Sequence, residues 1–435
     1  QRSKKDRRTR KTKKMVGTMA KIDDSVKKKV PELRFPGFTD DWEERKLGDL
    51  ATSFEYGLNA SAKSFDGTHK YIRITDIDDS SRKFNSQSLT SPDIDLSSAD
   101  NYKLKNGDIL FARTGASVGK SYIYADSDGL VYYAGFLIRA RIKSGVDSNF
   151  VFQHTLTSSY ENFIRVTSQR SGQPGVNAKE YSTFEISVPS YEEQRKIGSF
   201  FKQLDDTITL HQRKIDLLKE QKKGYLQKMF PKNGAKVPEL RFEGFADDWE
   251  EHKLGEFSDV RDGTHASPKY VSQGHPMVTS KNLTHSGLDM TDVSFLTDED
   301  FNEINKRSKV SIGDILFGMI GTIGNPVIVD RDDFAIKNVA LIKEKTSNPI
   351  TNKWLLQYLK SPSFNRFIQK ENAGGTQKFI ALGLIRDMKL RVPEFDEQQK
   401  IGSFFKQLDN TIALHQRKLD LLKEQKKGFL QKMFF

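Results

Sequence analysis

A glycine-rich run, GASVGKS from Gly115 to Ser121, is the stretch of this sequence that most resembles a phosphate-binding loop. A P-loop has four residues between its glycines, whereas this run has three. The corresponding run in the second half, GTIGNP from Gly321, has no lysine. Both runs are therefore expected to be turns between strands, with glycines in the left-handed conformation.

Other residues that could carry catalysis are missing. The chain contains no cysteine, which excludes a disulfide framework, a zinc finger and any thiolate metal site. No dinucleotide fingerprint follows an expected strand, and no His-Glu-x-x-His occurs. Neither half places two acids at equivalent positions beside a basic residue. We therefore expect a binding protein without a catalytic site of its own.

The segments that must position any binding residues occur twice in the sequence. The twenty residues from Pro31 recur from Pro238 with about fifteen identical positions. The segments that end at Phe230 and Phe434 are closer still, with about six differences in thirty-nine. Nearly identical flanking segments around divergent inserts favour two insert domains with different binding functions. We call the repeated flanking segments the mounts of the two inserts. A solenoid would need at least three repeats.

The two inserts, Ala51 to Tyr191 and Ser258 to Phe395, keep only scattered landmarks. GLNASAKSF matches GTHASPKY, YIRITDI matches MVTSKNL, and NGDILFARTGASVG matches IGDILFGMIGTIG. Their apolar runs between turn residues predict strand-rich mixed domains with helical pieces. Strands are expected at Ile109 to Phe111 and Ile315 to Phe317, and a helix at Lys353 to Lys360.

Apolar side chains recur at alternating spacings of four and three along both repeated segments, which predicts two coiled-coil helices. The apolar seam comprises Ile197, Phe201, Leu204, Ile208, Ile215 and Leu218 in the first helix, and Ile401, Phe405, Leu408, Ile412, Leu419 and Leu422 in the second. A helix of nearly forty residues spans on the order of 55 Å. His211, His415, Lys222 and Lys426 also fall in the seam and are expected to fix register and partner, not to bind a ligand.

Heptads alone do not say which helices pair. The first helix leads through PKNGAKV into the second PELRF, and a similar link would lead from the last helix back to the first PELRF. This nearly circular plan favours antiparallel pairing within the chain over pairing with another chain. The expected fold is α+β and pseudo-two-fold, with two mixed domains separated by two long helices in an antiparallel intramolecular coiled coil.

The net charge of +12 is unevenly distributed. The first thirty residues hold roughly thirteen Lys or Arg against three Asp, which leaves the rest of the chain at about +2. Any nucleic-acid surface must therefore be a local patch. The tail is expected to be a disordered arm, either attracting phosphates nonspecifically or lying upstream of the functional chain, as Met15 and Met19 favour.

The pattern of PELRF, Trp, KLG, a divergent block, a GDIL turn, a Gly-Thr-Gln-Lys-Phe element and then a long helix resembles the specificity (S) subunit of Type I restriction-modification systems. The resemblance runs from about Pro31 to the end of the sequence; the basic segment before Pro31 departs from it. It implies two target-recognition domains, each reading half of a bipartite double-stranded DNA site, with the coiled coil setting the unread spacer. The expected regions are a tail at 1–30, recognition domains at 31–191 and 238–395, and helical regions at 192–237 and 396–435.

The same resemblance implies that two methyltransferase (M) subunits dock on the helical regions and bring S-adenosylmethionine for adenine methylation. Motor-nuclease (R) subunits, which use ATP and magnesium, would join for restriction, and this chain would bind no cofactor itself. A basic end of the first helix, with Lys214, Lys219, Lys222, Lys223 and Lys228, could meet phosphates or an acidic partner, or be simply solvated. The cytoplasm is the expected location, because no run is apolar enough to cross a bilayer.

Polar residues on short turns are the expected DNA contacts, with Arg or Lys suited to guanine and Asn or Gln to adenine. In the first domain these are Asn59, Ser61, Lys63, Arg73, Thr75, Arg113, Ser117, Gln173 and Asn177. In the second they are His265, Ser267, Lys269, Ser280, Lys281, Asn282, Gln377 and Lys378. Nearly neutral domains leave open a coiled-coil adaptor with two protein-binding heads. A self-sufficient nuclease is disfavoured by the missing motifs.

Overall fold

The computed structural model describes residues 30–434 except 86, 170–171, 233, 286, 346–349 and 372–378. The basic tail at 1–29 and the predicted contacts Gln377 and Lys378 lie outside the described residues. The chain forms two compact units, called unit 1 (Gln1–Leu210 with Asp420–Phe435) and unit 2 (His211–Leu419). Each unit therefore combines one head with parts of both long helices.

Unit 1 is built around a four-stranded antiparallel sheet in the order β2-β9-β6-β7. Two-stranded pairs β1-β10, β3-β5 and β4-β8 flank it. The strands are β1 (Glu43–Lys46), β2 (Ala51–Tyr56), β3 (Ala62–Ser64), β4 (Lys70–Ile72), β5 (Thr90–Pro92), β6 (Ile109–Ala112), β7 (Ser121–Ile123), β8 (Val131–Tyr133), β9 (Leu137–Ile142) and β10 (Glu185–Val188). The helices are α1 (Leu47–Leu50), α2 (Ser148–His154), α3 (Ser158–Thr167), α4 (Ala178–Tyr181) and the first part of α5 (Tyr191–Lys228).

Unit 2 repeats the central sheet, in the order β12-β21-β18-β19, but it has a second four-stranded sheet, β13-β17-β14-β20, where unit 1 has the pairs β3-β5 and β4-β8. Its strands are β11 (Glu250–Lys253), β12 (Ser258–Asp262), β13 (Tyr270–Val271), β14 (His275–Val278), β15 (Leu283–Thr284), β16 (Gly287–Leu288), β17 (Ser294–Leu296), β18 (Ile315–Gly318), β19 (Gly324–Ile328), β20 (Ala335–Ile336), β21 (Val339–Glu344) and β22 (Lys389–Val392). Its helices are α6 (Leu254–Phe257), α7 (Asp298–Ser308), α8 (Asn352–Lys360), α9 (Pro362–Glu371), α10 (Leu382–Asp387) and most of α11 (Phe395–Met433). The predicted strands from Ile109 and Ile315 are confirmed as β6 and β18, and the predicted helix as α8.

The glycine-rich run after β6 is a turn between strands, as the sequence predicted. Gly115 and Gly119 have φ of 69° and 84°, and Gly321 and Gly324 have φ of 74° and 94° in the equivalent turn, which leads into β19 at Gly324. In unit 1 the buried Tyr181 holds this turn, since its hydroxyl donates to Ala112 O and accepts from Gly119 N. The run therefore has a structural explanation that needs no phosphate.

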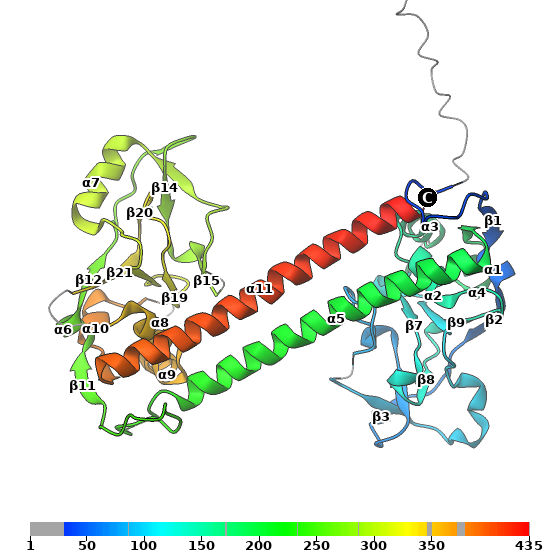
Figure 1. Cartoon of the computed structure of the whole chain (residues 1–435), viewed down its shortest axis with the longest axis horizontal. Helices are drawn as coiled ribbons and strands as arrows, with labels where there is room; N and C mark the ends of the chain where they lie inside the picture. The colour runs from blue at the N-terminus through cyan, green and yellow to red at the C-terminus, as the bar shows by residue number, and fades with distance from the viewer. Residues whose placement is uncertain are drawn as a thin grey trace, which may run out of the picture. The chain divides into compact units, whose positions relative to one another are not determined.

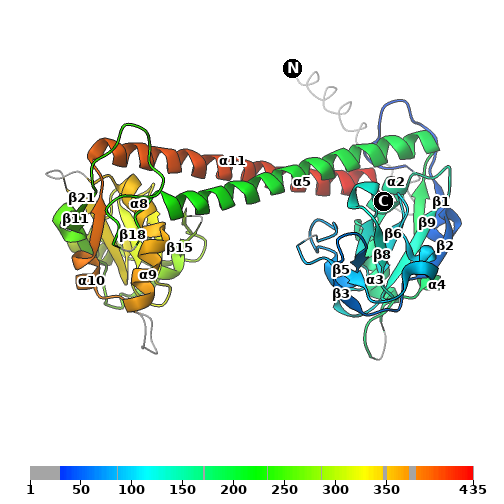
Figure 2. The same cartoon turned by 90° about the horizontal axis from the view of Figure 1, so that it is seen from below.

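The long helices pair in antiparallel fashion within each unit (Figures 1 and 2). In unit 2 the ring of Tyr225 on α5 lies 5.0 Å from that of Phe404 near the start of α11. In unit 1 the ring of Phe200 near the start of α5 lies 5.0 Å from that of Phe429 near the end of α11. The predicted antiparallel coiled coil within the chain is thus confirmed in both units.

A buried ion pair joins the repeated PELRF segment to the first turn of a long helix in both units. Arg34 donates two hydrogen bonds of 2.7 and 2.8 Å to Glu193, and Arg241 does the same to Glu397. Both glutamates are fully buried. Trp249 Nε1 also donates to Glu397, at 3.1 Å. These contacts explain why the segment and the helix start are repeated together.

A glycine in each helix allows the head to approach closely. A Cβ on Gly198 would lie 2.1 Å from the Asp147 carboxylate, which caps α2, and one on Gly402 would lie 3.0 Å from Trp354 N in α8. The helix starts then complete the head cores. Phe201 packs with Trp42 and Phe150 in unit 1. The connection between head and helix is therefore built alike in the two units.

Candidate functional site

Three side chains meet at one end of the central sheet of unit 1. Tyr56 is the last residue of β2, Arg113 directly follows β6 and Phe136 directly precedes β9. The antiparallel register of these neighbouring strands brings the three together. Arg113 N donates a hydrogen bond of 3.1 Å to Phe136 O. We call these residues the Arg113 cluster.

The two rings of the Arg113 cluster lie against its guanidinium group. The guanidinium carbon is 5.1 Å from the Tyr56 ring centre and 5.7 Å from the Phe136 ring centre. Tyr56 is 44% exposed and Phe136 is 56% exposed, so both residues reach solvent at this end of the sheet. The Tyr56 hydroxyl accepts a hydrogen bond from Ala178 N at the start of α4, which holds the ring. The cluster is a half-buried arginine held by two aromatic rings that are exposed to solvent.

Several residues predicted as contacts surround this cluster. The Gln173 amide lies over Gly115, where a Cβ would be 2.8 Å from its nitrogen. Ser117 ends the short turn that begins at Gly115. Asn177 caps α4, accepting from Glu180 N at 2.9 Å. The Asn59 backbone passes next to Gly135, which precedes Phe136. The structure therefore brings Arg113, Ser117, Gln173, Asn177 and Asn59 to one end of the head.

The other contacts predicted in unit 1 lie elsewhere or have partners. Ser61, which directly precedes β3, and Lys63 on β3 both approach Asp93, at 3.5 and 3.9 Å. Arg73 makes two hydrogen bonds of 2.8 and 2.9 Å to Asp76, so its guanidinium is already occupied. The neighbouring Thr75 is exposed. Their predicted contacts with DNA stay predictions.

The equivalent end of the sheet in unit 2 carries different chemistry. Asp262 ends β12, Met319 follows β18 and Asn338 precedes β21, in the same register as Tyr56, Arg113 and Phe136. Met319 is buried. The predicted contact His265 bridges the other two, with Nε2 2.9 Å from Asp262 Oδ2 and Nδ1 2.8 Å from Asn338 Oδ1. These hydrogen bonds, first that of Asn338 and then that of Asp262, raise the pKa of His265.

The remaining contacts predicted in unit 2 are spread over two loops. Ser267 accepts a hydrogen bond of 3.2 Å from Lys337 Nζ, and Lys269 is exposed nearby in the chain. Lys281 is exposed and pairs with Asp292 at 2.9 Å. Ser280 and Asn282 are buried.

Asn282 holds its own loop together. Its Oδ1 accepts from Thr279 N at 2.9 Å, and its Nδ2 donates to the carbonyl oxygens of Asp289 and Asp292 at 3.1 and 2.9 Å. Its side chain therefore has a full set of partners within the loop. A base contact by Asn282 stays a prediction, while its amide has an evident structural role.

Sequence reasoning missed Tyr56, Phe136, Asp262 and Asn338. Aromatic residues in a strand-rich block are normally core residues, so Tyr56 and Phe136 gave no polar signal. Asn338 has φ of 56°, which asparagine tolerates better than most residues. Tyr56 directly precedes Gly57, and Asp262 directly precedes Gly263, which is the glycine that corresponds to Gly57 in the second half. Comparing the residues beside these two glycines would have paired Tyr56 with Asp262.

The predicted seam residues lie between the helices or against the heads. Ile197, Phe201, Ile215, Leu218, Ile401, Phe405, Leu419 and Leu422 are buried, and Leu204, Ile208, Leu408 and Ile412 are partly buried. The polar seam residues meet partners in a defined register. His211 Nδ1 lies 3.1 Å from His415 Nδ1, Lys222 pairs with Asp409 at 2.5 Å, and Lys426 pairs with Asp205 at 2.6 Å.

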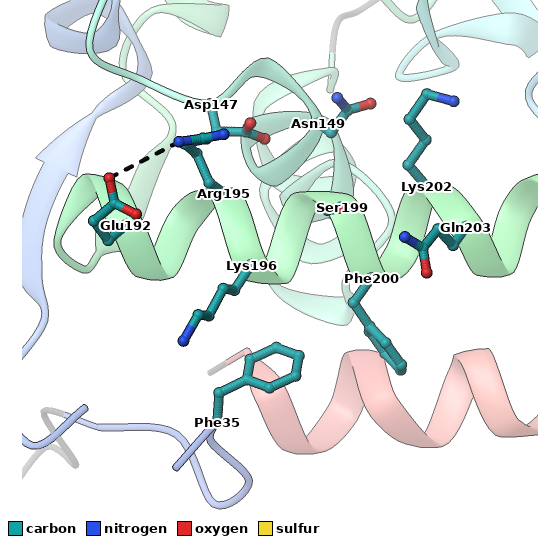
Figure 3. A pocket seen from close by; sticks show the side chains of 10 residues that line it. All are labelled: Phe35, Asp147, Asn149, Glu192, Arg195, Lys196, Ser199, Phe200, Lys202 and Gln203. Carbon is teal, nitrogen blue, oxygen red and sulfur yellow. Dashed lines mark ion pairs between the residues drawn. The ribbon is translucent and has the colours of Figure 1, made fainter. Parts of the chain in front are cut away.

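A groove runs beside the start of the long helix in each unit. In unit 1 it has a volume of about 660 Å³, and Lys196 and Phe200 of α5 line it opposite Phe35 (Figure 3). In unit 2 a groove of about 560 Å³ is lined by Lys400 and Ser403 of α11. Lys196 lies over the Phe38 ring and Lys400 over the Phe245 ring, at 4.8 and 4.5 Å. The two grooves thus share a repeated lysine and serine, because Ser199 lines the first groove as Ser403 lines the second.

Leucines outside the seam are also repeated. Leu210 and Leu217 of α5 are 67% and 48% exposed, and Leu414 and Leu421 of α11 are 66% and 51% exposed. Each pair is seven residues apart on its own helix, so the two leucines share a face. Packing between α5 and α11 does not require these side chains.

Among the described residues no group of three side chains is suited to hold a metal ion. None of the described helices is both long enough and apolar enough to span a membrane. The described residues form two sheet ends with different side chains and two similar helix surfaces. These features define a protein with two different heads on equivalent mounts.

Comparisons with known proteins agree with this class. The model of the Type I restriction modification DNA specificity domain matches residues 39–220 and 246–424. The Type I restriction enzyme MjaVIII specificity subunit of Methanocaldococcus jannaschii is 22% identical over 416 residues, covering 93% of each chain. A putative MjaX specificity subunit from the same organism is 22% identical over 404 residues, covering 90% of this chain and 92% of its own length.

A solved structure shares the fold. The Type I restriction-modification S subunit from M. genitalium superposes with a TM-score of 0.65 at 16% identity, covering 93% of this chain and 99% of its own. Because the family model covers most of the sequence, in both halves, this chain belongs to the family of Type I restriction-modification specificity subunits. The resemblance inferred from the repeated motifs is confirmed.

Proposed function

We propose that each head reads one half of a bipartite double-stranded DNA site. The observation that carries this proposal is the contrast within the chain: mounts that agree nearly residue for residue support sheet ends with unlike side chains. The end of the first head presents an arginine between aromatic rings. The end of the second presents a hydrogen-bonded histidine, aspartate and asparagine. Two different half-sites require two different binding surfaces at equivalent positions of the two heads.

The coiled coil is proposed to set the unread spacer between the half-sites. Helix α5 has 38 residues and α11 has 39. At about 1.5 Å per residue each is about 57 Å long, more than the roughly 34 Å of one DNA turn. The polar pairs in the seam support a fixed register, because sliding one helix along the other would separate Lys222 from Asp409 and Lys426 from Asp205.

Two methyltransferase subunits are proposed to dock on the repeated helical regions, one on each repeat. Support comes from the surface: Lys196 and Ser199 of the first groove recur as Lys400 and Ser403 of the second, and the exposed leucines recur as well. A partner present in two copies would meet the same side chains twice. In this proposal the partners carry S-adenosylmethionine for adenine methylation, and nuclease subunits carry ATP and magnesium for restriction. This chain acts in the cytoplasm as a non-catalytic subunit.

The test is to map methylated adenine in DNA from cells that express the chain with its methyltransferase partner. The proposal expects a split motif, with two short specified blocks separated by bases of any kind. Cells lacking only this chain should show none of that methylation. Methylation that persists without the chain would contradict the proposal. So would a chain that shows no salt-sensitive binding to duplex DNA in the presence of the partner, as expected of a protein adaptor.

A further inference from the structure

Arg113 has no acidic partner among the described residues, unlike Arg139 and Arg141 of the neighbouring strand β9. Arg139 pairs with Glu55, and Arg141 pairs with Asp108 at 2.8 Å. Arg113 instead lies between Tyr56 and Phe136, and its Nε atom is buried without a hydrogen-bond partner. Cation–π contacts with two rings hold the group but leave its charge without a counter-ion. Such a guanidinium is suited to meet an acceptor brought from outside.

The aromatic rings decide what kind of acceptor fits. Rings lie against the faces of a guanidinium and leave its in-plane N–H groups available. Those N–H groups form a planar fork that matches the O6 and N7 atoms of guanine in the major groove. A phosphate would also accept from the fork, but exposed rings gain little beside a charged, hydrated phosphate. They pack well against base edges and thymine methyl groups.

The second head supplies a built-in comparison. At the position of Arg113 it has the buried Met319, and at the positions of the two rings it has Asp262 and Asn338. It therefore has no arginine fork at this place. A reader that exists in one head alone specifies a base in one half-site alone.

We infer that Arg113 reads a guanine in the half-site of the first head, with Tyr56 and Phe136 as positioning residues that hold its guanidinium at the major groove. The inference rests on the proposed DNA-reading function and adds the base and the residues that select it. Tyr56 is fixed by its hydrogen bond from Ala178 N, and Phe136 by the hydrogen bond between its carbonyl and Arg113 N. The fork is thus oriented before DNA arrives, which favours a specific contact.

The test uses the full chain with its methyltransferase partner and a binding selection on random duplexes, read together with methylation mapping. Arg113→Lys keeps the charge and removes the fork, and Arg113→Ala removes both. Each should reduce the preference for guanine at one position about ten- to hundred-fold. The other half-site and the spacer should not change, which also shows that the variant is folded. Arg45→Lys, at an exposed arginine of the same unit, is the matched control and should leave the motif intact.

The positioning role has its own readout. Phe136→Ala should weaken the preference at that same guanine, and Phe136→Tyr should restore it because the ring is retained. Arg113 variants that return the parental motif at full strength would overturn the inference while leaving DNA reading intact. Uniform weakening of all sites with a smaller salt dependence would also overturn it, since that marks a phosphate contact. Loss of both half-sites would overturn it too. A wild-type complex with no motif would instead defeat the proposed function.

Discussion

Replacing Glu397 by glutamine should destabilise unit 2 by about 3 kcal/mol, because it breaks a buried ion pair while keeping the size of the side chain. Arg241 is 13% exposed and Glu397 is fully buried, so the arginine left behind has little access to water. Two charge-assisted hydrogen bonds, of 2.7 and 2.8 Å, lose their anion. Breaking a buried pair typically costs about 3 to 5 kcal/mol. The lower figure applies because glutamine retains an acceptor for Trp249 Nε1.

Urea unfolding followed by tryptophan fluorescence measures this change. The chain has three tryptophans, and Trp249 and Trp354 both lie in the core of unit 2. A Trp42→Phe background therefore makes the signal specific to that unit. With a slope of about 2.5 kcal/mol per molar urea, a loss of about 3 kcal/mol lowers the midpoint by about 1 M.

The matched control is Glu243→Gln, an exposed glutamate that follows the PELRF segment of the same unit, which should change stability by less than about 0.5 kcal/mol. A Glu397→Gln midpoint that stays within about 0.2 M of the parent would refute the reasoning. It would mean that the Arg241–Glu397 pair contributes little to holding the PELRF segment on the helix.

Two further predictions concern titration and chain connectivity. Burial, and then the charge of Lys222, lower the pKa of Lys360 to about 8. Between about pH 8 and 10.5 the unfolded chain therefore keeps a proton that the folded chain has released. Because the unfolded state binds more protons in this range, the free energy of unfolding should rise with pH. Urea unfolding at pH 7, 8 and 10 should show this rise for the wild type and a smaller one for Lys360→Met; equal slopes would contradict the assignment. Leu33 N donates to Lys432 O at 2.8 Å, as Leu240 N does to Lys228 O across the internal link. We consider a circular permutant in which a copy of PKNGAKV joins the C-terminal helix to Pro31 and the original link is opened. This permutant should keep the parental DNA motif. Loss of a folded circular-dichroism spectrum would contradict the equivalence of the two links.

Periodicity made the helical frame predictable. Heptads are a local property of the sequence, so the seam from Ile197 to Leu218 could be placed without knowing the fold. Repetition supplied the rest, because near-circular order favoured antiparallel pairing, which the contact between Tyr225 and Phe404 bears out. The polar seam pairs were expected to fix register, but which residues meet, such as His211 and His415, depends on the offset between two helices. That offset is a tertiary property.

The surface of the heads was harder to predict, because it depends on strand register. Arg113 was found from its residue type on a turn, but the two rings beside it come from strands distant in sequence. Only the pairing of β9 with β2 and β6 places them together. Asn282 shows the opposite difficulty. A polar residue on a short turn is equally suited to contact a base and to stabilise its own loop. The sequence does not show whether such a side chain is buried, and Asn282 is buried in the structure.

Duplicating one head tests the central claim most directly. In this variant, residues 51–184 of the first head replace residues 258–388 of the second, at junctions that are equivalent because Leu47 N donates to Phe184 O as Leu254 N does to Met388 O. The retained β11–β22 pair and the helices keep the mount unchanged. Methylation mapping of the complex with its methyltransferase partner should then give a symmetric motif, with the first half-site present twice in inverted order. A folded variant that still methylates the parental asymmetric motif would contradict the claim that each head reads its own half of the site.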